Sequence, residues 1–364
     1  MTVPPPVPAR VLVVDDSTFV RRTLRKIFHG QPGLSVVGEA GDGGEALVRI
    51  GELKPDIVTL DIQMPGMDGF TALRAIKARW PNLPVIVLAS ASQDGAGAAL
   101  DALSLGAIDF VDKSRATAMD FHLLGGEILG KVTAALEGRR AAPKREPSLR
   151  APLSRPPSRP GPFPDEIRMI CIGASTGGPQ AIQEVMDHLP GSFPFPMAIV
   201  QHMPVGFTGA FAERLNRTSP LEVKEAAEGD MFRPGRALIA PAGAHLVFRE
   251  GLKGVTAGLE AEPAANPHVP SVDVLFDSAA DVFGTAALGI VMTGMGSDGR
   301  EGARALARRG AFVVAEAEES CAVYGMPRAV VDAGLADAVW TIAEITDQLG
   351  RAARGARIGE ERTP

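Results

Sequence analysis

The chain has 364 residues, a hydrophobic content of 45% and a formal net charge of −6. This length predicts about two or three domains, and the charge argues against nucleic acid as a main partner. Cys171 and Cys321 are the only cysteines, which excludes a disulfide framework and a cysteine-rich metal site. No signal-peptide pattern and no apolar run of about 18–20 residues is present, so we expect a cytoplasmic protein without direct membrane insertion.

The N-terminal part alternates between short apolar strands and helices. The expected strands are 11–14, 34–38, 57–60, 85–88 and 108–111, and the expected helices are 18–28, 44–50, 70–79 and 96–105, the first capped by Asp16 or Ser17. Such alternation predicts a doubly wound parallel sheet, whose functional residues lie at the carboxyl ends of the strands. Four charged residues follow such ends: Asp15, Asp16, Asp61 and Lys113.

Three carboxylates at one sheet edge repel each other and therefore predict a bound cation. All-oxygen ligands favour Mg²⁺ over zinc. A carboxylate beside Mg²⁺ and a lysine suits phosphoryl acceptance, because both cations offset the phosphoryl charge. The alternative is that these aspartates only cap helices, which fits Asp16 alone but fits the four residues together poorly.

These motifs carry a resemblance. Val14-Asp15-Asp16, the run 61–69, and Gly106-Ala107 followed by Lys113 resemble the receiver domain of two-component response regulators. The resemblance covers about residues 10–130, and we assign the domain to 10–137. It implies a flavodoxin-like fold and phosphorylation of Asp61 by a CheA-type histidine kinase. It also implies a magnesium site made by Asp15, Asp16, Asp61 and the Gln63 carbonyl, and switch roles for Lys113, Ser90 and Phe110.

Two positions depart from the receiver pattern. Ala89 stands where the family usually has Ser or Thr, with Ser90 next to it. Ser114 follows Lys113 where the family usually has proline. The first departure bears on the link between phosphorylation and conformational change.

A proline-rich segment divides the chain. Between residues 143 and 164, eight of 22 residues are proline, with five Arg or Lys and one Glu. Such a composition cannot form a core and predicts an extended, semi-rigid linker, which we place at 138–164. Residues 1–9 are expected to form an N-terminal tail and residues 350–364 a disordered C-terminal tail.

A serine lies on a glycine-flanked turn at 173–178, between an expected strand at 168–172 and an expected helix at 179–189. Such a turn directs backbone N–H groups at an incoming group, which suits a nucleophile that attacks a carbonyl. Three alternatives compete. A phosphate-binding loop would need glycine where Ser175 stands and an acid where His202 stands. A G-x-S-x-G nucleophile elbow also fits, and the serine could simply cap its helix.

Two further chemical groups follow strand ends in this half. His202 ends the expected strand 197–201, and Asp298 lies in the glycine-rich turn 293–299, between an expected strand at 287–292 and an expected helix at 300–309. Ser175, His202 and Asp298 thus map to one sheet edge, as a catalytic triad requires. Alone, His202 is equally consistent with a core histidine and Asp298 with a turn residue. The order Ser, His, Asp differs from that of α/β-hydrolases, so we set that fold aside.

The other histidines of this half are weaker candidates. His188 lies near a helix end and is expected on the surface, His245 opens an expected strand, and His268 lies in a proline-rich loop.

Four motifs in order carry a second resemblance: 173–178, Gln201-His202-Met203, 293–299 and Tyr324-Gly325-Met326-Pro327 resemble the catalytic domain of the CheB methylesterases. This implies a Rossmann-like α/β domain at 165–349 with a triad of Ser175, His202 and Asp298. It further implies the Met295 backbone N–H in the oxyanion hole, Thr176 in the same site, and no cofactor for hydrolysis. The implied substrates are glutamyl methyl esters on the cytoplasmic domains of methyl-accepting chemoreceptors, with related deamidation of glutamines, and a receiver that represses the site until it is phosphorylated.

Three other functions are compatible with parts of the sequence. The first is a non-catalytic, phosphorylation-dependent receptor adaptor, which the intact triad argues against. The second is a methylesterase that serves a non-chemotactic receptor pathway. The third is a DNA-binding response regulator, but the second half is too long and too rich in strands for a simple helix-turn-helix module. We expect a monomer that binds no nucleic acid.

Overall fold

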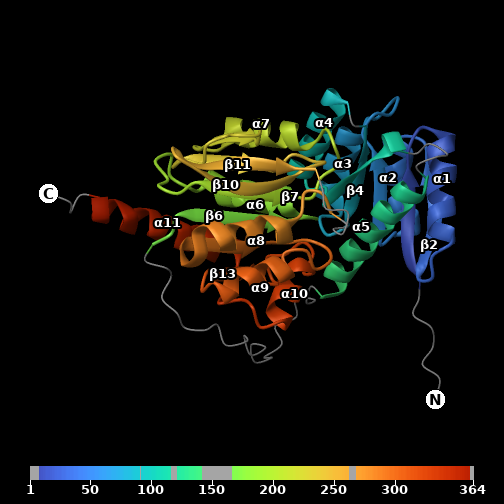
Figure 1. The fold of residues 1–364 in the computed structure, drawn as a ribbon. Coiled ribbons are helices and arrows are strands. Elements are labelled where there is room, and N and C mark those ends of the chain that lie inside the picture. Colours follow the sequence, from blue (N-terminus) through green and yellow to red (C-terminus); the bar gives the residue numbers. More distant parts are fainter. Residues whose placement is uncertain (1–7, 91, 116–120, 142–165, 262–267, 361–364) are drawn as a thin grey trace, which may run out of the picture. The chain divides into compact units, whose positions relative to one another are not determined.

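The computed structural model describes residues 8–90, 92–115, 121–141, 166–261 and 268–360. The chain divides into two compact units, Met1–Ala141 and Ala142–Pro364, each built on its own parallel sheet (Figure 1). Most of the expected linker, 142–164, lies outside the described residues, as do residues 1–7 and 361–364 of the expected tails.

The first unit contains a five-stranded parallel sheet in the order β2-β1-β3-β4-β5. Its strands are β1 (Ala9–Val14), β2 (Leu34–Ala40), β3 (Ile57–Asp61), β4 (Val85–Ala89) and β5 (Asp109–Asp112). Its helices are α1 (Thr18–His29), α2 (Gly43–Leu53), α3 (Gly69–Arg79), α4 (Gln93–Ser104), the short 3₁₀ turn η1 (Lys113–Arg115) and α5 (Phe121–Ala141). The predicted doubly wound arrangement of this unit is confirmed.

Local sequence explains how α1 begins and which face it buries. The Ser17 hydroxyl accepts a hydrogen bond from the Val20 N–H, so Ser17, and not Asp16, is the cap. Leu24, Ile27 and Phe28 recur at helical spacing and are buried in the core of this unit. Burial of each such side chain stabilises the fold by about 1.5–3 kcal/mol.

The second unit contains a seven-stranded parallel sheet in the order β14-β13-β12-β6-β7-β9-β8. Its strands are β6 (Met169–Ala174), β7 (Met197–Gln201), β8 (Glu222–Glu225), β9 (Arg236–Ile239), β12 (Ala287–Val291), β13 (Phe312–Glu316) and β14 (Ala338–Trp340). Its helices are α6 (Gly178–Asp187), α7 (Thr208–Thr218), α8 (Val272–Phe283), the 3₁₀ turn η2 (Gly284–Ala286), α9 (Arg300–Arg308), α10 (Met326–Asp332) and α11 (Ile342–Glu360). The predicted Rossmann-like α/β arrangement is confirmed.

The helices of the second unit form two groups. Helix α8 packs against α9, whereas α6 packs against α7 and α11 (Figure 1). Strand β6 lies in the middle of the sheet, between β7 and β12. Its first five residues, from Met169 to Gly173, pair with β12. The carboxyl ends of these three strands therefore meet at one edge.

An antiparallel hairpin is formed by β10 (His245–Gly251), the strand expected to open at His245, and by β11 (Gly254–Glu260), which was not expected from the sequence. It packs against α8 rather than joining the seven-stranded sheet. Its buried face, which includes Leu246 and Phe248, contributes to the same core as Val272 and Phe276 of α8.

Four elements begin or end at residues other than those expected from the sequence. Helix α11 continues to Glu360, through the expected C-terminal tail, because Leu349 and Ala353 fall on one face four residues apart and are buried. Helix α5 continues to Ala141, inside the expected linker, and β1 begins at Ala9, inside the expected N-terminal tail. Helix α6 begins at Gly178, so Pro179 is its second residue rather than its first.

Within the described residues, no helix combines the length and the apolar character needed to cross a bilayer.

Candidate active site

Ser175 follows directly after β6, on a turn whose shape requires two glycines. Gly177 adopts a left-handed conformation with φ +79° and caps α6. A β-carbon on Gly178 would lie 2.7 Å from Cβ of Ala174 and would also press on the Gln201 amide, which favours glycine at this position. The Gln201 amide in turn donates a hydrogen bond of 2.8 Å to the Ser175 carbonyl. Ser175 is therefore held between the start of α6 and the end of β7.

The pairing of β6 with β7 brings His202 beside the serine. Ala174 pairs with Gln201, so the next residues of both strands, Ser175 and His202, emerge next to each other. The His202 N–H also donates to the Ala174 carbonyl at 3.0 Å. The register of the sheet thus decides the meeting of these two residues, which are far apart in the chain.

The loop after β12 borders the serine from the other side. The Ser175 N–H donates to the Thr293 carbonyl at 3.0 Å, and a β-carbon on Gly294 would lie 2.8 Å from Cβ of Ser175. Thr176 is buried, and its carbonyl accepts a hydrogen bond from the Thr293 hydroxyl. Among the described residues, the Met295 N–H has no acceptor, which leaves it available to a developing oxyanion.

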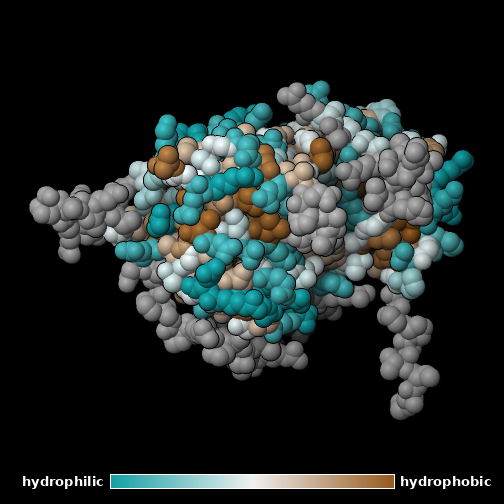
Figure 2. Space-filling view, in the orientation of Figure 1, coloured by the Kyte–Doolittle hydropathy of each residue, from teal (hydrophilic) through white to brown (hydrophobic). Residues whose placement is uncertain are grey.

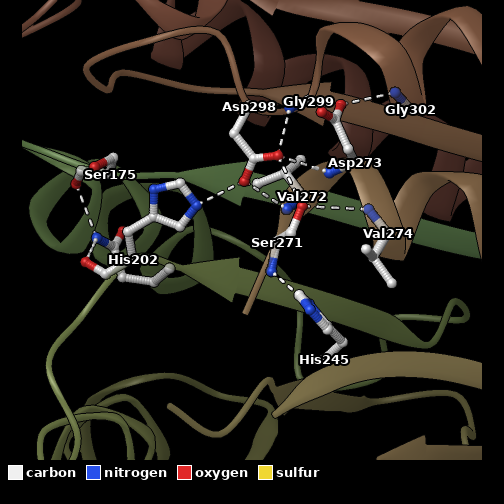
Figure 3. A network of polar contacts seen from close by, with 11 residues as sticks. Ser175, His202, His245, Ser271, Val272, Asp273, Val274, Asp298, Gly299 and Gly302 are labelled. Atoms are coloured by element: carbon white, nitrogen blue, oxygen red, sulfur yellow. Dashed lines mark hydrogen bonds and ion pairs between the residues drawn. The ribbon is translucent and has the colours of Figure 1, made fainter. Parts of the chain in front are cut away.

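His202 and Asp298 form a close pair. Nε2 of His202 lies 2.7 Å from Oδ2 of Asp298, and Figure 3 shows the ring between Ser175 and Asp298. The other ring nitrogen, Nδ1, is buried and has no hydrogen-bond partner in the described part of the chain. No described hydrogen bond joins the ring to the Ser175 hydroxyl, which is common before substrate binds. Nδ1 is thus the nitrogen left to act as a base.

The Asp298 carboxylate is buried and accepts hydrogen bonds from five groups (Figure 3). Besides His202, the donors are the Ser271 hydroxyl at 2.9 Å and the backbone N–H groups of Val272, Asp273 and Gly299 at 2.8, 3.0 and 3.1 Å. Two of these N–H groups open α8, whose N-terminus favours negative charge. Burial alone would raise the pKa of Asp298, but the bond to His202 and the backbone donors outweigh it and hold the pKa well below its usual range.

The remaining histidines fall in different places. His188 ends α6 and is exposed, as expected. His245 does open a strand, and its Nδ1 accepts a hydrogen bond from the Ser271 N–H. His268, expected only in a loop, stacks on His202, with ring centroids 4.3 Å apart and planes 16° apart. Burial and the neighbouring His202 lower the pKa of His268, which favours its neutral form.

The first unit carries a separate acidic site at the carboxyl ends of β1 and β3. Carboxylate oxygens of Asp15, Asp16 and Asp61 lie within 4.8 Å of one another. Lys113, just after β5, places Nζ 2.6 Å from Asp61 and 3.7 Å from Asp15. Burial and the charge of Asp61 raise the pKa of Asp15 to about 6, and burial raises the pKa of Asp61. One lysine does not compensate three carboxylates, so the residues present fit a divalent cation.

Some of the other expected residues of this unit lie beside Asp61, and the rest lie on β5 and the turn after it. Gln63 donates its N–H to Asp61, and Ala89 and Ser90 line a small cavity together with Asp61 and Lys113. Phe110 is buried on β5, with Nζ of Lys131 5.2 Å from its ring centroid. Ser114 bonds to Asp112 through both its N–H and its hydroxyl, which closes the turn that follows β5.

Comparison with known proteins matches each of the two units to a family. Residues 170–349 match the CheB methylesterase family and residues 11–119 match the response regulator receiver domain. A protein-glutamate methylesterase/protein-glutamine glutaminase 5 from Myxococcus xanthus is 45% identical over 334 residues, 90% of this chain and 93% of that protein. The chain belongs to the CheB family.

Other members of the CheB family are similar over comparable lengths. Protein-glutamate methylesterase/protein-glutamine glutaminase 1 from Oleidesulfovibrio alaskensis is 41% identical over 363 residues, 93% of this chain and 98% of that protein. The crystal structure of the Thermotoga maritima CheB methylesterase catalytic domain is 39% identical with a TM-score of 0.50, covering 51% of this chain and 98% of that chain. The fold of the second unit is thus that of the CheB catalytic domain.

Two groups near the triad of this CheB family member were not predicted from its sequence. One is the set of donors to Asp298 at the start of α8, although Ser271 followed by Val272 and Asp273 is a recognisable helix start. The other is the stacking of His268 on His202, for which the sequence offers no signal because the two residues are 66 positions apart.

His268→Ala should lower kcat for ester hydrolysis by about two- to tenfold, because it removes the flat surface that holds the His202 ring. His268→Phe keeps that surface and should keep most of the activity. Steady-state kinetics of both variants against wild type test this. Equal losses in the two variants, or no loss in either, would show that stacking does not position His202.

Proposed function

We propose that this protein is a phosphorylation-activated protein-glutamate methylesterase. It hydrolyses glutamyl methyl esters on the cytoplasmic domains of methyl-accepting chemoreceptors, and also deamidates receptor glutamines, the two activities in the names of its relatives. The observation that supports this most is the His202–Asp298 pair, 2.7 Å apart, at the strand end next to Ser175. Its place of action is the cytoplasm, where these receptor domains lie.

Hydrolysis follows from the roles that the geometry allows. Ser175 attacks the ester carbonyl while Nδ1 of His202 takes its proton, since Nε2 is engaged by Asp298. Asp298 stays ionised and stabilises the resulting imidazolium. The imidazolium returns the proton to the leaving methoxide, and methanol departs. Water, activated by the same nitrogen, then hydrolyses the acyl-enzyme to glutamate and free serine.

The tetrahedral intermediate needs donors for its oxyanion. The Met295 N–H, which has no other described acceptor, and the N-terminus of α6 supply them. Thr176 is buried next to the nucleophile and lines the site on the side of the Met295 loop. The residues present supply the base, the nucleophile and the oxyanion donors, so we assign no cofactor to hydrolysis.

The first unit regulates this activity as a receiver. Asp61 accepts a phosphoryl group from a CheA-type histidine kinase, and Mg²⁺ held by Asp15, Asp16, Asp61 and the Gln63 carbonyl would offset the phosphoryl charge. Lys113 would pair with the phosphoryl oxygens in place of the bare carboxylate. Ser90 and Phe110 take the switch positions, with Ser90 standing in for the hydroxyl that Ala89 lacks.

Methanol release from methylated receptor membranes tests both halves of this proposal. A small phosphodonor with Mg²⁺ should raise the rate about 5- to 150-fold, the ordinary range of coupling energies, in wild type but not in Asp61→Asn. Deletion of residues 1–140 should raise the basal rate if the unphosphorylated receiver represses the site. If the rate of methanol release from wild type does not change with the phosphodonor, the proposed regulation by the receiver is refuted. If the protein binds the receptor but releases no methanol, the non-catalytic adaptor is the function that remains.

A further inference from the structure

A surface pocket of about 410 Å³ lies beside α9 and α10, outside the triad. Its charged lining residues are Arg300 and Arg304 of α9 and Arg328 and Asp332 of α10, and Gly325 forms part of its wall. Figure 2 shows hydrophilic side chains gathered over these two helices.

The wall of this pocket is shared with the active-site loop. A β-carbon on Gly325 would lie 2.6 Å from the Gly294 carbonyl oxygen and 3.2 Å from Cα of Met295. A β-carbon on Gly294 would lie 2.8 Å from Cβ of Ser175. A single backbone segment therefore separates the arginine-lined pocket from the nucleophile.

The arginines of the pocket have unused donors. Arg300 and Arg304 both bond through Nε to Glu301, and Arg328 bonds through Nε to Asp332. Within the described residues, the Nη groups of these three side chains donate no hydrogen bond, although each guanidinium carries four N–H donors there.

The ion pairs that the arginines do make are weak. The Glu301 and Asp332 side chains are 55% and 67% exposed, and such pairs contribute little because water screens them. Three arginines against these two carboxylates also leave one positive charge in excess. An incoming carboxylate can therefore bind two N–H groups at once, which is the geometry that a guanidinium favours.

We propose that this pocket binds carboxylate side chains of the protein substrate that flank the esterified glutamate. The inference rests on the proposed function and adds a determinant of its substrate: a polypeptide with acidic residues near the ester. On a helical substrate, a residue one or two turns from the ester lies about 5–11 Å along the axis, a spacing suited to a pocket one backbone layer from Ser175. Each hydrolysed neighbour adds a carboxylate, so demethylated segments should bind more tightly.

The test compares two double variants of the full chain, activated with phosphodonor and Mg²⁺. Arg304→Gln with Arg328→Gln removes two charges from the pocket. Arg308→Gln with Arg309→Gln removes two charges from exposed positions at the end of α9, outside the pocket. Methanol release is measured on a methylated receptor and on the same receptor with the acidic neighbours of the ester replaced by alanine.

The pocket variant should raise KM on the acidic receptor about tenfold with little change in kcat, and the control variant less than about twofold. The alanine-substituted receptor should show the raised KM with wild type and no further rise with the pocket variant. Equal KM values for wild type and the pocket variant on the acidic receptor would overturn this inference alone. A wild type that releases no methanol from either receptor would refute the proposed function, and this inference with it.

Discussion

Ser175→Ala should lower kcat for methanol release by about 10⁴- to 10⁶-fold while leaving the fold intact. The hydroxyl is the group that forms the acyl-enzyme, and the turn that carries it is held by backbone bonds to Thr293 and by the Gln201 amide, none of which uses the hydroxyl. Rapid-quench and steady-state assays of methanol release measure the loss, and thermal unfolding followed by circular dichroism checks the fold.

Ser297→Ala is the matched control for this variant. Ser297 lies on the same edge of the second unit, is exposed, and its hydroxyl makes no described hydrogen bond. The kcat of Ser297→Ala should stay within about twofold of wild type, as for ordinary surface substitutions. Retention of full activity by Ser175→Ala would show that another group is the nucleophile.

Asp298→Asn should lower kcat by about 10⁴-fold through the tautomer of His202. Oδ1 accepts three hydrogen bonds from Ser271, Asp273 and Gly299, so the asparagine carbonyl takes that side and its NH₂ faces His202. Nε2 must then accept a hydrogen bond, which moves the ring proton to Nδ1. The nitrogen that should act as the base would be blocked. The pH profile of kcat and the NMR signals of the ring nitrogens both report this change.

Ser271→Ala separates this effect from a general loss of support for Asp298. It removes one of the donors to Oδ1 and the cap of α8, but leaves the carboxylate and its bond to Nε2. We expect a loss of stability of about 1 kcal/mol and a fall in kcat of about tenfold or less. A fall as large as that of Asp298→Asn would mean that the orientation of the carboxylate, and not the tautomer, decides activity.

Local patterns were sufficient for the sheet of the first unit and for β6, β7 and β12 of the second, whereas β8, β9, β13 and β14 were not expected from the sequence. Apolar runs such as 57–60 and 197–201 are strands in the structure, because parallel strands buried on both faces need continuous hydrophobic sequence. The hairpin β10–β11 was missed, since only His245 was noted as a strand start and no strand was expected at 254–260. The extent of α11 was missed because its arginines and glycines conceal the apolar spacing of Leu349 and Ala353.

The sequence by itself determined which chemical groups this protein has and at which strand ends they lie. Ser175, His202 and Asp298 could be assigned to one edge because strands joined by helices run parallel and end together. The same argument brought Asp15, Asp61 and Lys113 together in the first unit.

Only the tertiary structure decided how those groups face one another. That Nε2 of His202, and not Nδ1, contacts Asp298 depends on the position of a loop 96 residues away. Two of the backbone donors to Asp298 come from the start of α8, and the ring that stacks on His202 is that of His268. The arginine pocket lies between α9 and α10. Each contact joins segments distant in the chain, and their meeting is set by the packing of whole helices on the sheet, which no local pattern records.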